Sequence, residues 1–374
     1  MNGLYIHIPF CHSKCGYCDF YSITQLELMD AFVEGLRKEI HLRAPQYNSI
    51  TFNTLFWGGG TPTLLPEKHL QHIRNALFSH FNISPDAEIT IEANPGTLSP
   101  EKLALLRSLG FNRLSMGVQS FNPGELEFLG RIHTVADVLE NFQAARNAGF
   151  RNINIDLMTA FPGITESSFK NTLQEAVHLF PEHISCYTLI FEPGTVFYKR
   201  MEQGELQPLG EDEEAGYYEF ARDFLNRYGY QGYEISNFSR GEEFVCRHNL
   251  IYWQHHPYIG LGPSAHSFYQ QKRFSNKRSV LAYLKDLQKE RLPIGFVEEL
   301  SLEKQMFEFV FLRLRLRQGI PVHEFKKRFG VDFFQQYDET LQKLMSENLI
   351  EQNGDTVRLS EKGWMIADTV AAYF

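Results

Sequence analysis

Three cysteines stand close together near the N-terminus and could bind one inorganic centre. Cys11, Cys15 and Cys18 are spaced C-x3-C-x2-C, directly after an apolar run from Leu4 to Pro9. Iron–sulfur clusters are held mainly by cysteine thiolates, normally four of them. Three thiolates would leave one iron of a 4Fe-4S cluster without a protein ligand, and such an iron can bind a small molecule. The spacing therefore favours a cluster that takes part in chemistry.

A zinc site and unliganded thiols are the alternatives to a cluster. Structural zinc normally has four ligands, often from paired C-x2-C units, and His12 lies inside the loop at a spacing that fits no zinc finger. The two other cysteines, Cys186 and Cys246, are far from the first three and from each other in the sequence. An odd count of five cysteines without a leader sequence argues against a disulfide framework.

The composition is that of an ordinary folded protein. Its 374 residues allow one large domain and a smaller one. The net charge of −9 argues against a general nucleic-acid binder, which usually carries a basic surface. No apolar run reaches the length of a membrane span, and no charged leader with an apolar core precedes the first strand. Reduced thiols and a cluster therefore predict a cytoplasmic protein.

Strands and helices alternate up to about residue 190, and these elements must position the cysteines. The predicted strands are Leu4–Ile8, Thr54–Trp57, Glu88–Glu92, Arg113–Val118, Asn152–Leu157 and His183–Leu189. The predicted helices are Leu26–Arg43, Pro66–Ser79, Pro100–Leu109, Val135–Ala148 and Glu166–Leu179. Such alternation indicates parallel strands joined by right-handed crossovers. Six strands without a seventh or eighth favour an α/β fold with an incomplete barrel.

Glycines and polar residues follow the carboxyl ends of these strands, where ligands bind in such folds. The second strand leads into Gly58-Gly59-Gly60-Thr61, whose backbone can approach a ligand closely and offer it N–H groups. The next strand ends contribute Glu92, Gln119 with the following Arg131, and Asp156. Carboxylates and Gln can bind hydroxyl or ammonium groups, and Arg can pair with a carboxylate. Each residue alone could be structural, whereas their joint position favours a ligand site.

A segment rich in histidine and aromatic residues follows a predicted helix at Glu211–Tyr228 and a predicted short strand at Tyr233–Phe238. Cys246–His266 holds four histidines within nineteen residues and ends in a glycine-rich stretch that we interpret as a loop. Imidazole is a common metal ligand, and both His and Cys ligate heme iron. The segment supports the hypothesis of a metal or heme site; for heme, aromatic walls and cationic partners for propionates could come from Tyr252, Trp253, Tyr258, Arg240 and Arg247. The alternative is that this segment only packs the joint between two domains.

The pattern becomes helical from about Ser301. Helices are predicted at Lys304–Arg317, Val322–Phe329 and Phe333–Asn348, followed by a hairpin that joins Leu349–Gln352 to Thr356–Leu359. Three helices and a hairpin resemble a winged-helix unit, which often binds DNA. Ten Lys and Arg against eleven Asp and Glu in this part are poor for phosphate contacts. We therefore expect a lid or docking domain and keep a zinc-containing DNA-binding protein as the alternative of another class.

The first cysteine segment, Tyr5-x-His7-Ile8-Pro9-Phe10-Cys11-x3-Cys15-x2-Cys18, resembles the radical S-adenosylmethionine superfamily. Within it, the chain resembles the branch of oxygen-independent coproporphyrinogen III dehydrogenase and the HemW heme chaperones over nearly its whole length. The resemblance implies a (β/α)6 partial TIM barrel with a smaller, winged-helix-like α+β domain. We expect the barrel core at 1–190, a barrel extension and connecting region at 191–300, and the C-terminal domain at 301–374.

The resemblance also implies the site residues. A 4Fe-4S cluster would be bound by Cys11, Cys15 and Cys18. S-adenosylmethionine would be bound by Tyr5, Gly59, Gly60, Thr61, Glu92, Gln119, Arg131 and Asp156. His248, Asn249, Tyr252 and Trp253 match the HNxxYW signature of the chaperones. His248 is the candidate taken for heme, although the pattern does not single out one axial ligand in this segment.

Two departures favour a heme chaperone over the dehydrogenase. The dehydrogenase motif continues to a fourth cysteine as C-x3-C-x2-C-x-C, and Phe20 stands at that position here. The dehydrogenase also has an extension before the first strand, whereas this chain starts almost at the strand. The resemblance then implies heme, acceptor hemoproteins, some of them at the membrane, and an electron donor as partners of a monomer or homodimer, with no nucleic acid. Whether such a chaperone turns over as an enzyme stays open.

Overall fold

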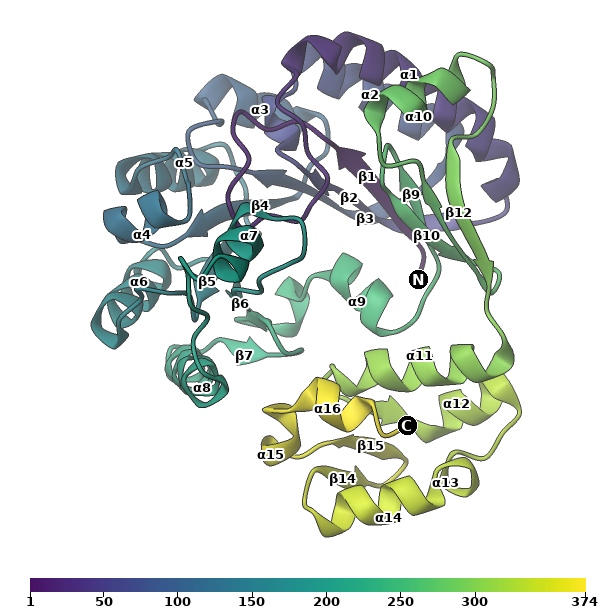
Figure 1. Ribbon diagram of the computed structural model, residues 1–374. Helices are drawn as coiled ribbons and strands as arrows, with labels where there is room; N and C mark the ends of the chain where they lie inside the picture. The colour runs from purple at the N-terminus through teal and green to yellow at the C-terminus, as the bar shows by residue number, and fades with distance from the viewer.

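Six parallel strands form the central part of a twelve-stranded sheet in the computed structural model, which describes residues 1–374 (Figure 1). They are β1 (Gly3–Ile8), β2 (Thr51–Gly59), β3 (Asn82–Ala93), β4 (Arg113–Gln119), β5 (Ile153–Thr159) and β6 (His183–Thr188). Each strand pairs in parallel with the next one along the chain. The predicted order of six parallel strands is therefore confirmed.

Helices cover the outer face of this sheet, as Figure 1 shows. They are α1 (Met29–Arg43), α2 (Glu67–His80), α3 (Pro100–Ser108), α4 (Pro123–Phe128), α5 (Val135–Asn147) and α6 (Glu166–His178). Side-chain caps fix where several of them begin; Thr134 and Asp137, for example, form a reciprocal capping box at α5. Side chains of a strand alternate between its two faces, so Ile153, Ile155 and Leu157 pack in the core while Asn154 and Asp156 face the inside of the barrel.

The region after β6 extends the sheet at both ends. At the β1 edge β9 (Tyr258–Leu261) adds in parallel, and β10 (His266–Tyr269), β11 (Lys272–Asn276) and β12 (Ile294–Glu299) follow antiparallel to their neighbours. At the β6 edge β8 (Asn237–Ser239) and β7 (Gln231–Gly232) are antiparallel. The helices of this region are α7 (Val196–Glu202), α8 (Glu211–Arg227), α9 (Arg247–Trp253) and α10 (Val280–Leu287).

Three sequence predictions in this region are wrong. Further strands do follow the sixth one, the glycine-rich stretch after Pro257 begins as strand β9 rather than a loop, and the strand predicted at Tyr233–Phe238 is replaced by the short β7 and β8 with a turn between them. These strands have two to six residues, too few for a clear two-residue alternation of apolar and polar positions.

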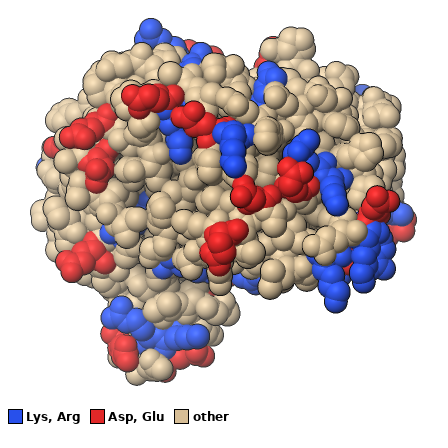
Figure 2. Space-filling model, turned by 90° about the horizontal axis from the view of Figure 1, so that it is seen from above, with Lys and Arg blue, Asp and Glu red and all other residues tan.

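Charged residues of both signs are mixed on the face of the molecule seen from above (Figure 2). Many of them are paired across neighbouring elements. At the sheet edge, for example, Arg273 of β11 pairs with Glu298 of β12 at 2.8 Å. Such exposed pairs contribute little individually to stability. This face therefore carries no continuous stripe of a single sign.

The C-terminal part has its own hydrophobic core and a three-stranded sheet in the order β13-β15-β14. Its elements are α11 (Leu302–Leu314), β13 (Ile320–Pro321), α12 (Val322–Phe329), α13 (Phe333–Gln336), α14 (Asp338–Ser346), β14 (Ile350–Asn353), β15 (Thr356–Leu359), α15 (Glu361–Trp364) and α16 (Ala367–Ala371). The predicted hairpin is present, whereas the predicted helix at Phe333–Asn348 is interrupted at Tyr337. Helices followed by a hairpin agree with the expected winged-helix-like arrangement.

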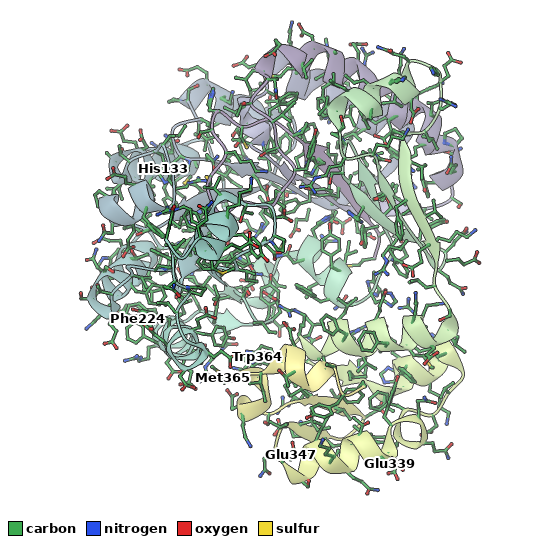
Figure 3. The ribbon with its side chains drawn as sticks, in the orientation of Figure 1. His133, Phe224, Glu339, Glu347, Trp364 and Met365 are labelled. Atoms are coloured by element: carbon green, nitrogen blue, oxygen red, sulfur yellow. The ribbon has the colours of Figure 1, made fainter.

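The C-terminal part contacts the barrel side through α8 and α15. Trp364 and Met365 lie on the side that faces α8, whereas Glu339 and Glu347 lie on the opposite side (Figure 3). The Trp364 Nε1–H donates a hydrogen bond of 2.6 Å to the Tyr218 hydroxyl. The seam thus combines a buried aromatic ring with a polar contact.

Candidate functional site

The cysteine loop leaves the carboxyl end of β1 and is anchored on both sides. The backbone N–H of Cys11 donates to the Ile23 carbonyl at 3.0 Å, and the Ile23 N–H donates to the Pro9 carbonyl at 2.7 Å. Cys11, Cys15 and Cys18 all line one cavity of about 480 Å³, together with residues from the ends of β2 to β6. The structure therefore brings the three predicted ligands to one side of one cavity.

Burial raises the pKa of the Cys18 thiol to about 11 and also raises the pKa of Cys11. Cys15 has a cationic neighbour, since Arg131 Nη1 lies 3.5 Å from its sulfur. Thiols with raised pKa values are protonated near pH 7 and become good ligands once a metal displaces the proton. All five cysteines of the chain are free.

The donor set fits a cluster better than a single ion. Nowhere do three His, Cys, Asp or Glu side chains converge on one point in the way a lone metal ion requires. In a 4Fe-4S cluster each thiolate binds its own iron, so the sulfurs need to surround a volume rather than a point. Three thiols on the wall of one cavity meet that requirement.

The glycine segment after β2 forms the second wall of this cavity, here called the cluster cavity. Gly59 has a φ of 106°, and a Cβ on it would lie 2.5 Å from the His7 ring. A Cβ on Gly60 would lie 2.6 Å from the Phe10 carbonyl oxygen. Thr61 is buried, and its hydroxyl accepts a hydrogen bond of 2.9 Å from Asn94. Only glycine permits this backbone beside the cysteine loop.

Glu92 and Asp156 line the cluster cavity as buried carboxyl groups. Burial, with the nearby charge of Asp156 as the second cause, raises the pKa of Glu92 to about 8. Burial likewise raises the pKa of Asp156. Glu92 accepts the backbone N–H of Gly59 at 3.1 Å, and Asp156 accepts from Asn154 at 2.7 Å. Both groups are poised to ionise when a cationic or hydrogen-bonding ligand arrives.

Arg131 and Gln119 complete the set on the cluster cavity. Arg131 comes from the loop after α4, and its Nη2 donates to Asn94 at 2.6 Å and to the Gly117 carbonyl at 2.7 Å. Gln119 has a φ of 72°, an uncommon value for a residue other than glycine. A strained backbone at a strand end is typical of functional sites.

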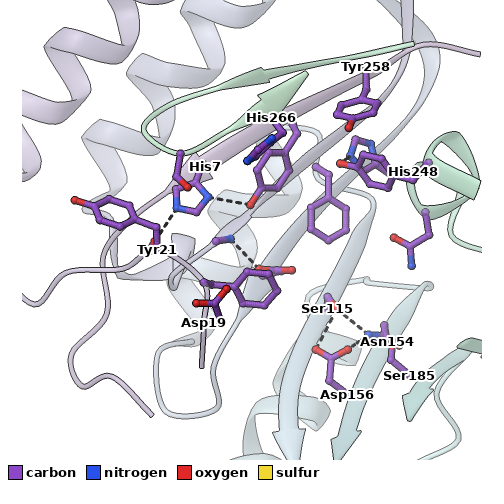
Figure 4. Close-up of a pocket in the computed structure, with 18 of the residues that line it drawn as sticks. His7, Asp19, Tyr21, Ser115, Asn154, Asp156, Ser185, His248, Tyr258 and His266 are labelled. Atoms are coloured by element: carbon purple, nitrogen blue, oxygen red, sulfur yellow. Dashed lines mark hydrogen bonds between the residues drawn. The ribbon is translucent and has the colours of Figure 1, made fainter. Parts of the chain in front are cut away.

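A second cavity of about 520 Å³, here called the lumen chamber, lies inside the barrel (Figure 4). Tyr5 and His248 line this chamber and are not part of the cluster cavity. Gly59, Glu92 and Asp156 line both cavities, which are therefore neighbours with a common wall. Of the twelve residues predicted for the site, ten line the cluster cavity and two lie in the adjoining chamber.

His248 is almost completely buried and both of its ring nitrogens are engaged. Nδ1 lies 2.6 Å from the Thr54 hydroxyl and Nε2 lies 2.9 Å from the Tyr252 hydroxyl. Its ring also stacks on Phe56, with the centroids 5.1 Å apart. His248 would have to give up one of these hydrogen bonds before it could ligate iron.

The two arginines suggested as propionate partners are used elsewhere. Arg240 pairs with Glu182 at 3.1 Å and lies over the Phe180 ring. Arg247 donates to the Asp86 carbonyl at 2.9 Å. Those two suggestions are therefore wrong: neither arginine lines the lumen chamber, because Arg240 after β8 is held by Glu182 and Arg247 at the start of α9 is held by the Asp86 carbonyl.

Several inward-facing residues of the lumen chamber were not among the residues predicted for the site. Arg113, Ser115, Asn154, Ser185 and Tyr187 line it from β4, β5 and β6. Arg113 is only 2% exposed, and its Nε has no hydrogen-bond partner. Polar residues at alternate positions of otherwise apolar strands were the available signal, since alternate positions face the same side.

An open parallel barrel with three cysteines after its first strand and a glycine cradle after its second defines a class of protein. A sequence model of the Radical SAM superfamily matches residues 5–176, and a model of the HemN C-terminal domain matches residues 300–366. Membership of this superfamily implies a 4Fe-4S cluster and S-adenosylmethionine as its cofactors. None of the helices is both long and apolar enough to cross a membrane.

Comparisons with relatives along the full length of the chain narrow the class further. The chain is 36% identical to the heme chaperone HemW of Bacillus subtilis, covering 100% of this chain and 99% of the relative. It is 35% identical to HemW of Mycobacterium tuberculosis H37Rv, covering 98% of this chain and 93% of the relative. It is 32% identical to HemW of Haemophilus influenzae, covering 100% of this chain and 97% of the relative. The chain belongs to the HemW family of the radical SAM superfamily.

A solved structure agrees on the fold. Coproporphyrinogen III oxidase (HemN) from Escherichia coli, a radical SAM enzyme, superposes with a TM-score of 0.87 over 100% of this chain and 89% of that one. The sequence identity is 24%, so this likeness shows the fold alone. It confirms the predicted α/β partial barrel with a smaller C-terminal domain.

Proposed function

We propose that this protein is a heme chaperone: it binds a 4Fe-4S cluster, S-adenosylmethionine and heme, and delivers heme to acceptor hemoproteins. The observation that carries the proposal is the similarity to relatives named heme chaperone HemW along essentially the whole of both chains. Acceptors at the membrane, an electron donor, a cytoplasmic location, a monomeric or dimeric state and the absence of nucleic acid among the partners belong to the same proposal.

The cluster is assigned to Cys11, Cys15 and Cys18, which share one cavity. Such a cluster, when bound, keeps one iron free of protein ligands and can pass one electron to S-adenosylmethionine. The protein's part is to hold the thiolates, exclude water and position the second cofactor. Partial burial of the thiols in the loop supports that part.

The remaining residues of the cluster cavity are assigned to S-adenosylmethionine. Gly59, Gly60 and Thr61 form the backbone cradle, and Glu92, Gln119 and Asp156 offer acceptors for ammonium or ribose hydroxyl groups. Arg131 provides the guanidinium for a carboxylate. Tyr5 is assigned to the adjoining wall of the lumen chamber rather than to the cradle itself.

Coproporphyrinogen III dehydrogenase is the second candidate because a structure of that kind shares the fold. Phe20 distinguishes the two, since it stands where the dehydrogenase motif has a fourth cysteine. The Phe20 side chain is 69% exposed and lines both cavities. An apolar residue at this rim cannot bind iron, which supports the chaperone.

One experiment tests the proposal in two halves. Anaerobically purified protein is titrated with heme and followed by visible absorbance, and porphyrinogen turnover is assayed with S-adenosylmethionine and a reductant. We expect one heme per chain and no decarboxylation. Decarboxylation without heme binding would establish the dehydrogenase instead.

The cofactor half has its own control. Replacement of all three cysteines by Ala is expected to abolish the brown colour and the iron and sulfide content, while Cys186→Ala leaves both unchanged, because Cys186 is buried in the core away from the cavity. A full 4Fe-4S complement in the triple variant would contradict the assignment.

A further inference from the structure

Asn94 lies at the wall of the cluster cavity and is not one of the residues predicted for the site. It follows directly after β3 and lines the cluster cavity together with Cys11 and Cys15. It also lines a neighbouring cavity of about 150 Å³, to which Cys15 belongs as well. The Thr97 N–H and hydroxyl both donate to the Asn94 carbonyl, at 3.1 Å and 2.6 Å. The Asn94 side chain therefore leaves a fixed turn beside the cysteine loop.

The Asn94 side chain is the middle of a chain of contacts between two cysteines. Arg131 Nη2 donates to Asn94 Oδ1 at 2.6 Å, and Asn94 Nδ2 donates to the Thr61 hydroxyl at 2.9 Å. At one end, Arg131 Nη1 lies 3.5 Å from Cys15 Sγ. At the other end, the Thr61 hydroxyl lies 3.7 Å from Cys11 Sγ. Both distances to sulfur are within the range of a hydrogen bond to this larger atom.

The direction of every hydrogen bond in this chain follows from its donors. A guanidinium can only donate, so the Asn94 atom that meets Arg131 has to be the carbonyl oxygen. The amide nitrogen of Asn94 then points at Thr61, whose oxygen accepts. The hydroxyl proton of Thr61 is left over and can be donated to Cys11. At both ends, donors are therefore directed at a sulfur, which suits a thiolate because a thiolate only accepts.

Asn94 also fixes the orientation of the Arg131 guanidinium. The Nη2 of Arg131 is held by Asn94 and by the Gly117 carbonyl at 2.7 Å. The Nε of Arg131 is buried and has no hydrogen-bond partner. Buried N–H groups are nearly always satisfied in folded proteins, so this one is available to a ligand. Arg131 is the residue assigned to the carboxylate of S-adenosylmethionine, and Asn94 keeps its free N–H in place.

Hydrogen bonds to the cysteine sulfurs change the reduction potential of an iron–sulfur cluster. Reduction adds a negative charge, and donors directed at the sulfurs stabilise that charge. Hydrogen bonds that are linked in a chain also polarise one another, so the loss of the middle group weakens both ends. The alternative is that Asn94 only ties the turn after β3 to its neighbours, which would leave the potential unchanged.

We propose that Asn94 is a positioning residue that directs hydrogen bonds at Cys11 and Cys15 and thereby raises the reduction potential of the cluster. Through the same side chain it holds the Arg131 guanidinium ready for S-adenosylmethionine. This inference rests on the proposed cluster and cofactor assignments and adds the group that orients their protein partners.

The test compares Asn94→Leu with Asn75→Leu, whose amide is exposed on α2. Leu has nearly the shape of Asn but makes no hydrogen bond. Both full-length variants are purified anaerobically, and their iron and sulfide contents are measured first. We expect both variants to carry a full cluster, because the three cysteines remain. Redox titration followed by electron paramagnetic resonance should give a more negative midpoint potential for Asn94→Leu and an unchanged one for Asn75→Leu.

Binding of S-adenosylmethionine provides a second measurement on the same proteins. Asn94→Leu removes one of the two acceptors that hold Arg131 Nη2, so the affinity should fall about tenfold, as expected for a displaced charged hydrogen bond. Asn75→Leu should bind as wild type does. Equilibrium dialysis measures both affinities.

Thr61→Val examines the Cys11 end of the chain by itself. Val keeps the shape of Thr and removes only the hydroxyl, so this variant also decides the question if Asn94→Leu does not fold. We expect a more negative midpoint potential in Thr61→Val. In a double-mutant cycle, Thr61→Val should lower the potential less in the Asn94→Leu background than in wild type, because the chain is already interrupted there.

The outcomes separate this inference from the proposed function. Wild-type protein without a 4Fe-4S cluster would overturn both. Midpoint potentials equal to wild type in Asn94→Leu and in Thr61→Val would overturn the role of Asn94 and leave the chaperone function intact. Lower thermal stability of Asn94→Leu at an unchanged potential would show that Asn94 only ties the turn, which also overturns the inference. Fully additive shifts in the double variant would show that Thr61 and Asn94 act separately, against the proposed chain.

Discussion

Glu92 is a buried acid of the site whose pKa is strongly raised. Burial raises its pKa to about 8, well above the 4.5 of an exposed Glu, so the folded protein retains a proton that the unfolded chain releases between these two pH values. Stability linked to this group is therefore fully present below pH 4.5 and is lost as the pH rises through 8.

A substitution of Glu92 tests this linkage in cofactor-free protein. Glu92→Gln keeps an acceptor for the Gly59 N–H but cannot ionise. It should change the free energy of unfolding little at pH 5 and raise it by about 1–3 kcal/mol at pH 8, since one pKa unit corresponds to about 1.4 kcal/mol. Urea unfolding at both pH values measures the difference. An equal gain at pH 5 and pH 8 would rule out titration of Glu92 as its cause.

Gly59 provides the second residue-scale prediction. A side chain here would meet the His7 ring and would also adopt an unfavourable φ, so Gly59→Val should weaken binding of S-adenosylmethionine at least tenfold. The matched control is Gly163→Val, which has a similar φ of 88° but nothing within 4 Å. Equilibrium dialysis of both variants measures the affinity. If both variants bound S-adenosylmethionine equally weakly, backbone strain rather than the side chain beside His7 would be responsible for the loss of affinity.

More of the inward-facing residues of the strands could have been predicted from the sequence. Glu92, Gln119 and Asp156 were found because each closes a strand that the sequence marks clearly. Arg113 and Asn154 stand on the same face two or more residues earlier, where alternation alone points to them. The engagement of His248 could be predicted only in part, because Tyr252 lies one turn further along α9, whereas Thr54 reaches His248 from the distant strand β2.

At the scale of elements, Glu88 attaches α9 to the barrel. Its carboxylate on β3 accepts the backbone N–H groups of Arg247 and His248, each at 3.0 Å. These N–H groups lie at the first turn of α9, where no intrahelical acceptor exists. The position of His248, and of the turn that follows the helix, thus depends on a residue about 160 positions away.

Removal of that carboxylate should loosen α9. Glu88→Ala leaves two N–H groups without acceptors and is expected to cost about 1.5–3 kcal/mol, with faster hydrogen exchange across Arg247–Trp253. Glu88→Gln retains an acceptor oxygen and should cost less. Faster hydrogen exchange confined to elements other than α9 would contradict the anchoring role. An equal loss of stability in Glu88→Ala and Glu88→Gln would contradict it as well.

The elements themselves were predictable in proportion to their length and periodicity. The six long strands and five of the six helices between them were predicted, with boundaries within three residues apart from the start of β3, because apolar runs and capping residues mark them. The short helix α4 was not predicted, and β3 begins at Asn82 rather than at Glu88. The short strands β7 to β10 have no more than four residues each; β7, β9 and β10 were not predicted, and β8 overlaps only the end of the strand predicted at Tyr233–Phe238. Two of them join the sheet by pairing with strands far away in the sequence, β9 with β1 and β8 with β6.

At the scale of the whole molecule, the seam between α8 and α15 holds the C-terminal part. Trp364 is buried and its Nε1–H has Tyr218 as its partner. Glu361 adds contacts to Arg222 and Arg317, though the acid is largely exposed and its pairs contribute little. The position of this seam could not be predicted from the sequence, since nothing in a local pattern indicates which surfaces of two domains meet.

Tyr218→Phe tests the seam with a minimal change. The variant leaves a buried indole N–H unsatisfied, which should cost about 1–3 kcal/mol and speed proteolytic cleavage near residue 300. Tyr373→Phe, at an exposed position, is the control. Limited proteolysis followed by mass spectrometry measures the rate and the cleavage site. Cleavage rates equal to wild type would show that other contacts hold the seam.

The wall shared by the cluster cavity and the lumen chamber has a thermodynamic consequence. Glu92 belongs to both cavities, so a cationic group bound on one side lowers its pKa and presents a negative charge to the other side. Occupancy of the two cavities is therefore coupled, and the coupling is reciprocal: each ligand changes the affinity of the other by the same factor. A cation bound in the cluster cavity would cause Glu92 to release its proton, and the resulting negative charge would lower the affinity of the lumen chamber for an anion. The protonation state of this one carboxyl group therefore couples ligand binding in the two cavities.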